Sequence, residues 1–196
     1  MTASPLDQLA AALAGTEQLV VEIGPDEWRL PTPCTDWSVR DVVNHLVAGH
    51  LLFVRVFAGE PLPPREELLA ASRTDRLGND AAGAFRASAA AVLDAFRSEG
   101  ALERMVTVPA GTFPGIAALH LRIVEALVHG WDVARGTGRR LTYADGLVEQ
   151  ELAFTRDTLP RLPPRPAGQG PFEPAQPVPD DAPPLDRLAA LLGRPV

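Results

Sequence analysis

The residues best suited to chemistry lie in a stretch of about twenty residues that is expected to be one helix. Glu125 and His129 are four residues apart, so on a helix they share a face, with Cβ atoms about 6 Å apart. Asp132 falls on the same face, and the rest of the circumference is nearly all apolar, which is typical of a buried central helix. A buried carboxylate is costly unless it is paired, hydrogen-bonded or bound to metal. Glu125 and His129 are therefore candidate ligands of one cation.

A third ligand has to come from another helix. His45 and His50 both lie in the wide apolar arc of the second predicted helix, at about 38–59, and helical geometry does not choose between them. His120 projects roughly opposite Glu125 and is a poor candidate. Two imidazoles and one carboxylate suit Zn²⁺, and equally Ni²⁺, Co²⁺ or Fe²⁺, and three protein ligands leave coordination positions open, as in catalytic sites. The alternative is a buried Glu–His pair with ordinary core histidines.

Three further polar residues accompany this set. Asp132 is a candidate to accept a hydrogen bond from a ligating histidine, to serve as a spare ligand or to carry protons. The alternative role for Asp132 is an ion pair with Arg122 or Arg135. Arg122, about 60° from Glu125 on the same helix, is a candidate for binding a substrate carboxylate with two hydrogen bonds, or for an ion pair with a neighbouring acid. Cys34 is either a reactive thiol at the pocket mouth or a small buried turn residue.

The elements that position these residues are predicted to be helices, so the fold class is all-α. Apolar residues at helical spacing predict long helices, and Ser38 with Asp41 forms a capping-box pattern at the start of the second. Thr112 is expected to cap the fourth helix, with Pro114 in its first turn. Residues 104–108 are expected to form a short strand or an extended loop. The helices are expected at about 4–23, 38–59, 80–97, from Thr112 to about 135, and 145–159, with a short helical turn at 65–72.

Composition narrows the function classes. The chain has 196 residues and a formal charge of -7, which argues against a nucleic-acid binder and against attraction to an anionic membrane. The apolar stretches are interrupted by charge or histidine, and the start lacks the pattern of a secretory signal. With one cysteine, an internal disulfide is excluded, and a reducing cytoplasm is the expected location. Ten prolines between positions 160 and 184 predict an extended arm, followed by a short amphipathic helix.

Two stretches that carry these residues resemble a known family. TPCTDWSVRDVVNHLVAGH, at 32–50, and EALVHGWDVARGTG, at 125–138, are similar to the mycothiol-dependent maleylpyruvate isomerase family. The resemblance implies a DinB-like four-helix bundle over residues 1–160, with residues 161–196 as a proline-rich arm and a short helix packed on it, as in a single-domain branch. It also implies a divalent metal, zinc first, held by His45, Glu125 and His129, and so selects His45 over His50.

The same resemblance implies a thiol cofactor and a reaction class. Mycothiol is the expected thiol, and the arginine-only basic residues fit the GC-rich genome of an actinobacterium. We expect a metal- and thiol-dependent isomerase or S-transferase that acts on a small electrophile. The chain is shorter than the isomerase and ends in the arm, so the metal site is expected to carry over better than the reaction. The alternatives are a metal-binding or stress-response bundle without turnover, and a structural bundle that self-associates, for example as a homodimer.

Overall fold

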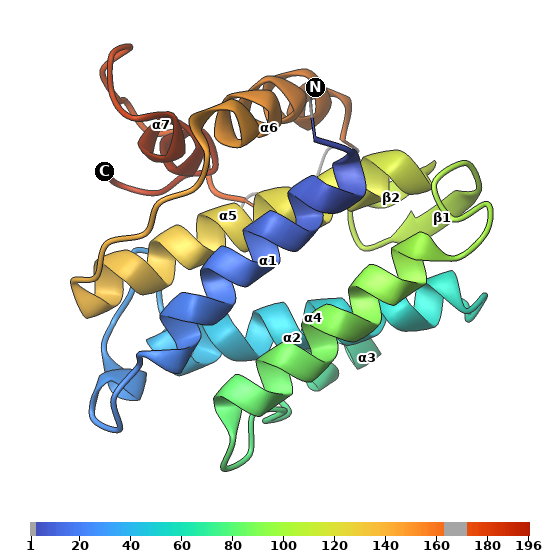
Figure 1. The fold of residues 1–196 in the computed structure, drawn as a ribbon, viewed down its shortest axis with the longest axis horizontal. Helices are drawn as coiled ribbons and strands as arrows, with labels where there is room; N and C mark the ends of the chain where they lie inside the picture. The colour runs from blue at the N-terminus through green and yellow to red at the C-terminus, as the bar shows by residue number, and fades with distance from the viewer. Residues whose placement is uncertain (1–2, 163–171) are drawn as a thin grey trace.

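Four long helices form the body of the protein. The structure, a computed structural model, describes residues 3–162 and 172–196. The bundle consists of α1 (Pro5–Val21), α2 (Val39–Phe57), α4 (Ala81–Arg97) and α5 (Gly115–Thr137). Helices α1 and α2 each pack against both α4 and α5 (Figure 1). The predicted all-α fold class and helical bundle are confirmed.

Helix α5 is the centre of the molecule. It contacts α1 and α2 inside the bundle and α6 (Asp145–Thr158) and α7 (Pro184–Leu191) outside it. Its side chains are buried along most of its length, as the nearly continuous apolar circumference predicts. The helix ends at Gly138, whose φ of 67° is a left-handed conformation that glycine adopts without steric cost. A polar side chain on α5 is therefore held on a rigid, buried support.

Helices α6 and α7 form an outer layer over α5 (Figure 1). A 3₁₀ turn, Leu159–Arg161, follows α6. Of the expected proline-rich arm, residues 163–171 lie outside the described part of the chain. Residues 172–183 contain no helix or strand, and α7 then packs against α5 and α6. No helix among the described residues is both long and apolar enough to cross a membrane.

The start of α2 follows from local sequence. The Ser38 hydroxyl accepts a hydrogen bond from the Asp41 backbone N–H at 3.3 Å, and the Asp41 carboxylate accepts one from the Ser38 N–H at 2.9 Å. This is the predicted capping box, and it satisfies two backbone donors that the first helical turn leaves free. A 3₁₀ turn, Glu27–Arg29, and a loop connect α1 to this point. The cap fixes where α2 begins and thus the direction in which His45, two turns later, projects.

A hairpin replaces the expected cap of α5. Strand β1 (Met105–Val108) pairs antiparallel with β2 (Gly111–Pro114), so the strand alternative at 104–108 is correct. Thr112 lies in β2, where its hydroxyl is 3.0 Å from that of Thr107 across the hairpin. Pro114 precedes the first residue of α5, and no side chain caps that helix. The predicted Thr112 cap is wrong because the threonine pairs with Thr107 across the hairpin. The short helical turn predicted at 65–72 forms as α3 (Arg65–Ser72).

Candidate metal centre

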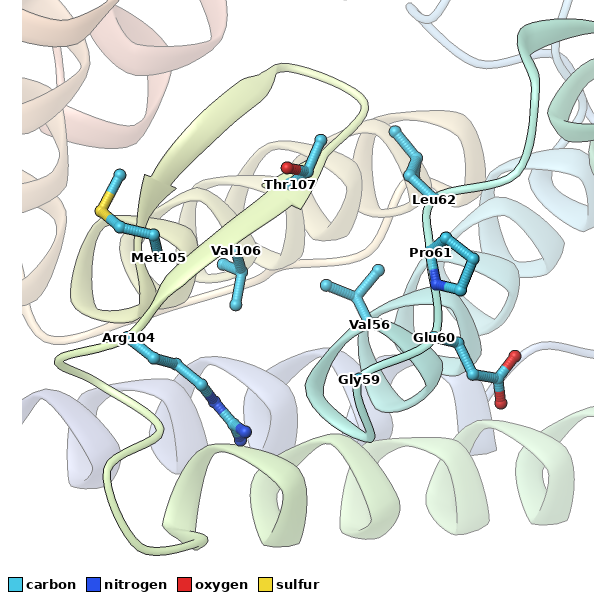
Figure 2. A pocket seen from close by; sticks show the side chains of 9 residues that line it. All are labelled: Val56, Gly59, Glu60, Pro61, Leu62, Arg104, Met105, Val106 and Thr107. Carbon is cyan, nitrogen blue, oxygen red and sulfur yellow. The ribbon is translucent and has the colours of Figure 1, made fainter.

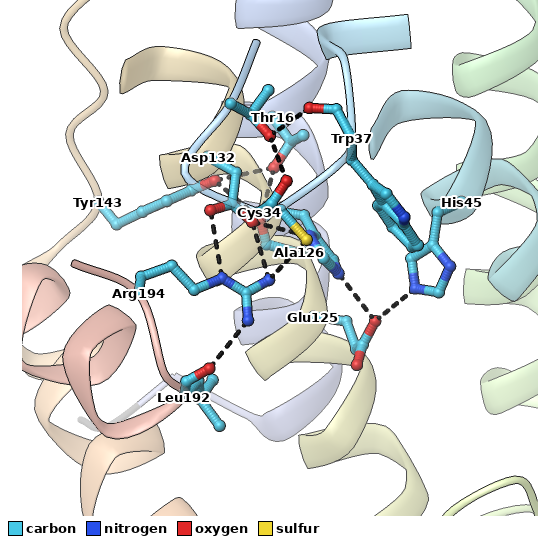
Figure 3. A network of polar contacts seen from close by, with 12 residues as sticks. Thr16, Cys34, Trp37, His45, Glu125, Ala126, Asp132, Tyr143, Leu192 and Arg194 are labelled. Carbon is cyan, nitrogen blue, oxygen red and sulfur yellow. Dashed lines mark hydrogen bonds and ion pairs between the residues drawn. The ribbon is translucent and has the colours of Figure 1, made fainter. Parts of the chain in front are cut away.

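His45, Glu125 and His129 meet where α2 faces α5. The Glu125 Oε2 lies 3.1 Å from the His45 Nε2 and 3.4 Å from the His129 Nε2, and one candidate ligand atom from each residue lies within 4.8 Å of the others. Figure 3 shows the Glu125 carboxylate directed at His45. The His129 side chain is 5% exposed, whereas those of Glu125 and His45 are 19% and 34% exposed. The cluster is therefore anchored in the core and open to solvent on its His45 side.

The other two histidines lie elsewhere. His50 is fully buried, and its Nδ1 is 3.0 Å from the Ser88 hydroxyl on α4. His120 projects to the outer layer, where its Nδ1 is 2.8 Å from the Glu151 Oε1 on α6. The structure thus brings His45, and neither of these, to Glu125. The helical projection had placed His120 correctly and had left His45 and His50 undecided.

Asp132 supports His129 from behind. Its side chain is fully buried, and its Oδ2 lies 3.0 Å from the His129 Nδ1. Because a carboxylate oxygen accepts hydrogen bonds, the His129 Nδ1 donates to Asp132. The Nε2, 3.4 Å from the Glu125 Oε2, is then the nitrogen available to a metal ion once its proton is displaced. This is the usual arrangement around a metal-ligating histidine. The ion-pair partner of Asp132 is Arg194, at 3.0 Å (Figure 3). The alternative partners considered from the sequence, Arg122 and Arg135, do not fill this place.

Trp37 covers both histidines. Its ring centroid lies 4.8 Å from that of His45 and 5.9 Å from that of His129, and it stacks on His129 with an interplanar angle of 18°. Thr32 fixes the loop by donating its hydroxyl to the Trp37 carbonyl at 2.9 Å. Trp37 was not among the residues predicted for the site. Its place directly before the Ser38 cap of α2 was the available signal.

Cys34 lies at the edge of the same cluster. It is half-buried, and its Sγ is 3.4 Å from the Arg194 Nη2 (Figure 3). Burial raises the pKa of the Cys34 thiol to about 11, although the charge of Arg194 works in the opposite direction. The side chain is therefore a protonated thiol near neutral pH and a weak nucleophile. This state fits a packing role better than a reactive one.

Arg122 is a buried arginine on α5. It is 4% exposed, and among the described residues its Nε and Nη2 have no hydrogen-bond partner. The guanidinium lies over the Phe53 ring, 5.1 Å from its centroid. It fits there because position 49 is glycine: a Cβ on Gly49 would lie 2.7 Å from the Arg122 Nη1. Burial lowers the pKa of Arg122 while the Glu125 charge raises it, so a cation with free N–H groups lies one helical turn from the cluster.

The protonation states suit metal ligation in part. Burial raises the pKa of Glu125, but the hydrogen bonds from His129 and His45 outweigh it and hold that pKa well below its usual value. Burial lowers the pKa of His45 more than Glu125 raises it. For His129, burial lowers the pKa, but hydrogen bonds and charges from Asp132 and Glu125 raise it more. Ligands must be deprotonated, so a bound cation would displace a proton from His129.

A pocket of about 430 Å³ opens far from this cluster. It lies between the end of α2 and strand β1 (Figure 2). Val56, one of its lining residues, is eleven positions after His45, or roughly 16 Å along the helix axis. None of the predicted site residues lines it. Its lining consists of Val56, Gly59, Glu60, Pro61, Leu62, Arg104, Met105, Val106 and Thr107.

Comparisons with known proteins identify the family of the chain. Residues 9–134 match the family model of the mycothiol maleylpyruvate isomerase N-terminal domain. Uncharacterised proteins from two strains of Mycobacterium tuberculosis are 32% identical over 179 residues, which cover 91% of this chain and 91% of theirs.

Two solved structures share the fold. A crystal structure of the mycothiol-dependent maleylpyruvate isomerase superposes with a TM-score of 0.62 at 19% identity, over 76% of this chain and 66% of the isomerase. A mutant of that enzyme gives a TM-score of 0.56 at 20% identity over the same shares. The match thus spans just under two thirds of the isomerase's length. With a family model that covers 9–134 and relatives aligned over most of their length, the chain belongs to the mycothiol maleylpyruvate isomerase N-terminal domain family.

Proposed function

We propose that this protein is a divalent-metal-dependent enzyme that uses a small-molecule thiol, mycothiol, as an isomerase or S-transferase on a small electrophilic substrate. The observation that carries the proposal is the convergence of His45, Glu125 and His129, with one candidate ligand atom from each within 4.8 Å of the others. The family membership supports the thiol. The exposed His45 side of the cluster supports access for small molecules.

The residues present fit a metal ion. Two imidazole nitrogens and one carboxylate oxygen are a donor set that zinc accepts, and that nickel, cobalt and iron(II) also accept. The Asp132 carboxylate behind His129 fixes which imidazole nitrogen is free, as is usual around a ligating histidine. Three protein ligands leave coordination positions open, which is typical of catalytic rather than structural sites.

Each residue of the site has a proposed part. When bound, the metal would supply the positive charge that lowers the pKa of the thiol cofactor. His45, Glu125 and His129 hold the ion, and Asp132 orients His129; because Asp132 is fully buried and paired with Arg194, we assign it to orientation in place of proton transfer. Cys34 contacts the mycothiol cofactor but does not act as a nucleophile, because the pKa of its own thiol is raised.

Arg122 is the proposed binding residue for an anionic substrate group. A divalent ion, the Glu125 carboxylate and the Arg122 guanidinium together carry an excess of positive charge. A thiolate neutralises only part of this positive charge, and one further anionic group neutralises the rest. The unpartnered N–H groups of Arg122 match the geometry with which guanidinium binds a carboxylate. The proposed substrate therefore combines an electrophilic carbon with a carboxylate.

Metal content tests the first half of the proposal. The protein is purified without an affinity tag and its bound metal is measured for the wild type, His45→Ala, Glu125→Gln and His129→Ala. We expect close to one ion per chain in the wild type and strong loss in each variant. The matched control is His120→Gln, which changes a histidine on the ligand helix that faces Glu151. Absence of metal from the wild type, or equal content in all variants, contradicts the proposal.

Thiol consumption tests the second half. Mycothiol is offered with a panel of electrophiles, each as a carboxylate and as its neutral ester, and thiol loss is followed with and without a chelator. We expect loss that depends on metal and is faster for the carboxylates. Absent or chelator-insensitive loss across the panel contradicts the enzyme, and then a bound ion would indicate a metal-binding bundle without turnover.

A further inference from the structure

Arg194 inserts into the bundle from the segment after α7. Its side chain is 7% exposed, and all three guanidinium nitrogens are in use. The Nε lies 3.3 Å from the Asp132 Oδ1, the Nη2 lies 3.0 Å from the Asp132 Oδ2, and the Nη1 donates to the Leu192 carbonyl at 2.9 Å. The segment thereby contacts both carboxylate oxygens of a residue 62 positions earlier in the chain.

The course of the chain explains how the side chain reaches this place. Leu188 and Leu192 are fully buried and anchor α7 on the bundle. Gly193 then has a φ of 88°, a left-handed conformation that favours glycine. A Cβ there would lie 2.5 Å from the Glu173 Cβ. The turn at Gly193 directs Arg194 back toward α5.

The Asp132 Oδ2 is shared between two donors. It accepts from the Arg194 Nη2 at 3.0 Å and lies 3.0 Å from the His129 Nδ1. Arg194 thus restrains the rotation of the Asp132 side chain, and that carboxylate restrains the His129 ring. A fully buried carboxylate without the guanidinium would be an uncompensated charge, which is costly enough to change its orientation or protonation.

We propose that Arg194 is a positioning residue of the metal centre and that docking of the α7 segment is coupled to metal affinity. The inference rests on the proposed function and goes beyond it. Through Asp132, Arg194 holds the His129 ring in the orientation that presents its Nε2 beside Glu125. Because coupling between two equilibria is reciprocal, metal at the centre also favours the docked segment. Residues 184–194 thereby regulate the site that they adjoin.

Metal affinity is the first test. Affinity for Zn²⁺ is measured by competition with a chromophoric chelator for the wild type, Arg194→Gln and Arg194→Lys. We expect Arg194→Gln to weaken binding about 10–100-fold, as other changes behind a ligating histidine do, and Arg194→Lys, which keeps the charge but lacks the planar fork, to weaken it less. The matched control is Arg187→Gln, which removes the ion pair between α7 and Glu149 on α6. Its Zn²⁺ affinity should stay within about threefold of the wild type.

Two further readouts separate positioning from plain structural support. In metal-free protein, the His129 Nδ1 proton should give a slowly exchanging NMR signal that Arg187→Gln keeps and Arg194→Gln loses. Zn²⁺ should slow amide exchange across residues 184–194 in the wild type and not in Arg194→Gln. If that variant fails to fold, the same comparisons are made with Arg194→Lys.

The failures are distinguishable. A wild-type protein without affinity for any divalent ion overturns the proposed function, while the His129 signal still reports on Arg194. Equal Zn²⁺ affinity in Arg194→Gln and Arg187→Gln, or a retained His129 signal in Arg194→Gln, overturns the coupling and leaves the proposed function in place.

Discussion

The Nε2 of His45 lies 3.1 Å from the Oε2 of Glu125, and this contact joins α2 to α5 across 80 positions of sequence. With His129 one turn further along α5, the three side chains form a point where two helices are held together by polar atoms. An ion bound there would cross-link the helices. Binding to the folded state alone increases the free energy of unfolding in proportion to the logarithm of ion concentration.

Metal should therefore stabilise the fold. At a free Zn²⁺ concentration of about 100 times the Kd, we expect a gain of about 2.7 kcal/mol, or roughly 5–10 °C in Tm for a chain of this size. Glu125→Gln should abolish the gain, and His120→Gln should keep it. Differential scanning fluorimetry over a Zn²⁺ titration measures the shift. An equal shift in Glu125→Gln would show that the ion binds elsewhere.

Arg122→Met should increase the free energy of unfolding and weaken binding of a carboxylate substrate. The change replaces a buried guanidinium, whose Nε and Nη2 have no partner among the described residues, with an apolar side chain of similar length. Removing buried polar groups that lack partners should stabilise the fold by about 1–3 kcal/mol. The same variant should raise the KM for a carboxylate substrate about tenfold or more, since the anion loses its partner. Urea unfolding and steady-state kinetics measure the two effects. As a control, Arg86→Met changes an exposed arginine paired with Glu17 and should shift stability by less than about 0.5 kcal/mol.

Alkylation of Cys34 should be slow at neutral pH. The reactive species is the thiolate, and with a pKa of about 11 its fraction rises about tenfold per pH unit between pH 7 and 9. Iodoacetamide labelling followed by mass spectrometry measures this directly, because Cys34 is the chain's single cysteine. Protein unfolded in urea serves as the reference and should label about 300-fold faster at pH 7, since the pKa of an unperturbed cysteine is about 8.5. Equal rates in folded and unfolded protein would contradict the raised pKa.

Glu151→Gln should make stability less dependent on pH. Burial raises the pKa of Glu151, against the lowering effect of His120, so the unfolded state releases this proton at lower pH than the folded state does. The contribution of Glu151 is thus most favourable below a pH of about 4.5 and is lost as the pH rises through the folded-state pKa. We expect Glu151→Gln to increase the free energy of unfolding at pH 7–8 by on the order of 1 kcal/mol. Urea unfolding at pH 5 and pH 8 measures the difference, and a gain that is larger at pH 5 would contradict the sign.

Local spacing predicted the parts of the site that one helix determines. Glu125 and His129 came together because residues four apart on a helix always share a face. The Ser38–Asp41 cap was predictable for the same reason. His45 and His50 could not be separated in this way, because α2 is apolar over a wide arc and faces α5 on one side and α4 on the other. The direction of His50 is set by Ser88 on α4.

Ion-pair partners that are distant in the sequence could not be predicted from residue spacing. The candidate ion-pair partners of Asp132 were Arg122 and Arg135 on its own helix, whereas Arg194 reaches it from the segment that follows α7. That contact depends on how the chain returns after Pro183, which no local spacing encodes. The Thr112 cap failed for a related reason. A strand of four residues is too short to show a clear alternation of apolar and polar residues. The second strand of the hairpin was therefore not predicted, and its Thr112 was assigned to a helix cap.

The position of Trp37 beside the two histidines has a practical consequence. Its indole lies 4.8 Å from the His45 ring and 5.9 Å from the His129 ring, whereas Trp131 donates its Nε1 proton to Asp186 in the outer layer. Indole emission responds to charge placed next to the ring. Trp37 fluorescence should therefore report on a metal ion bound by His45, Glu125 and His129, without any added dye.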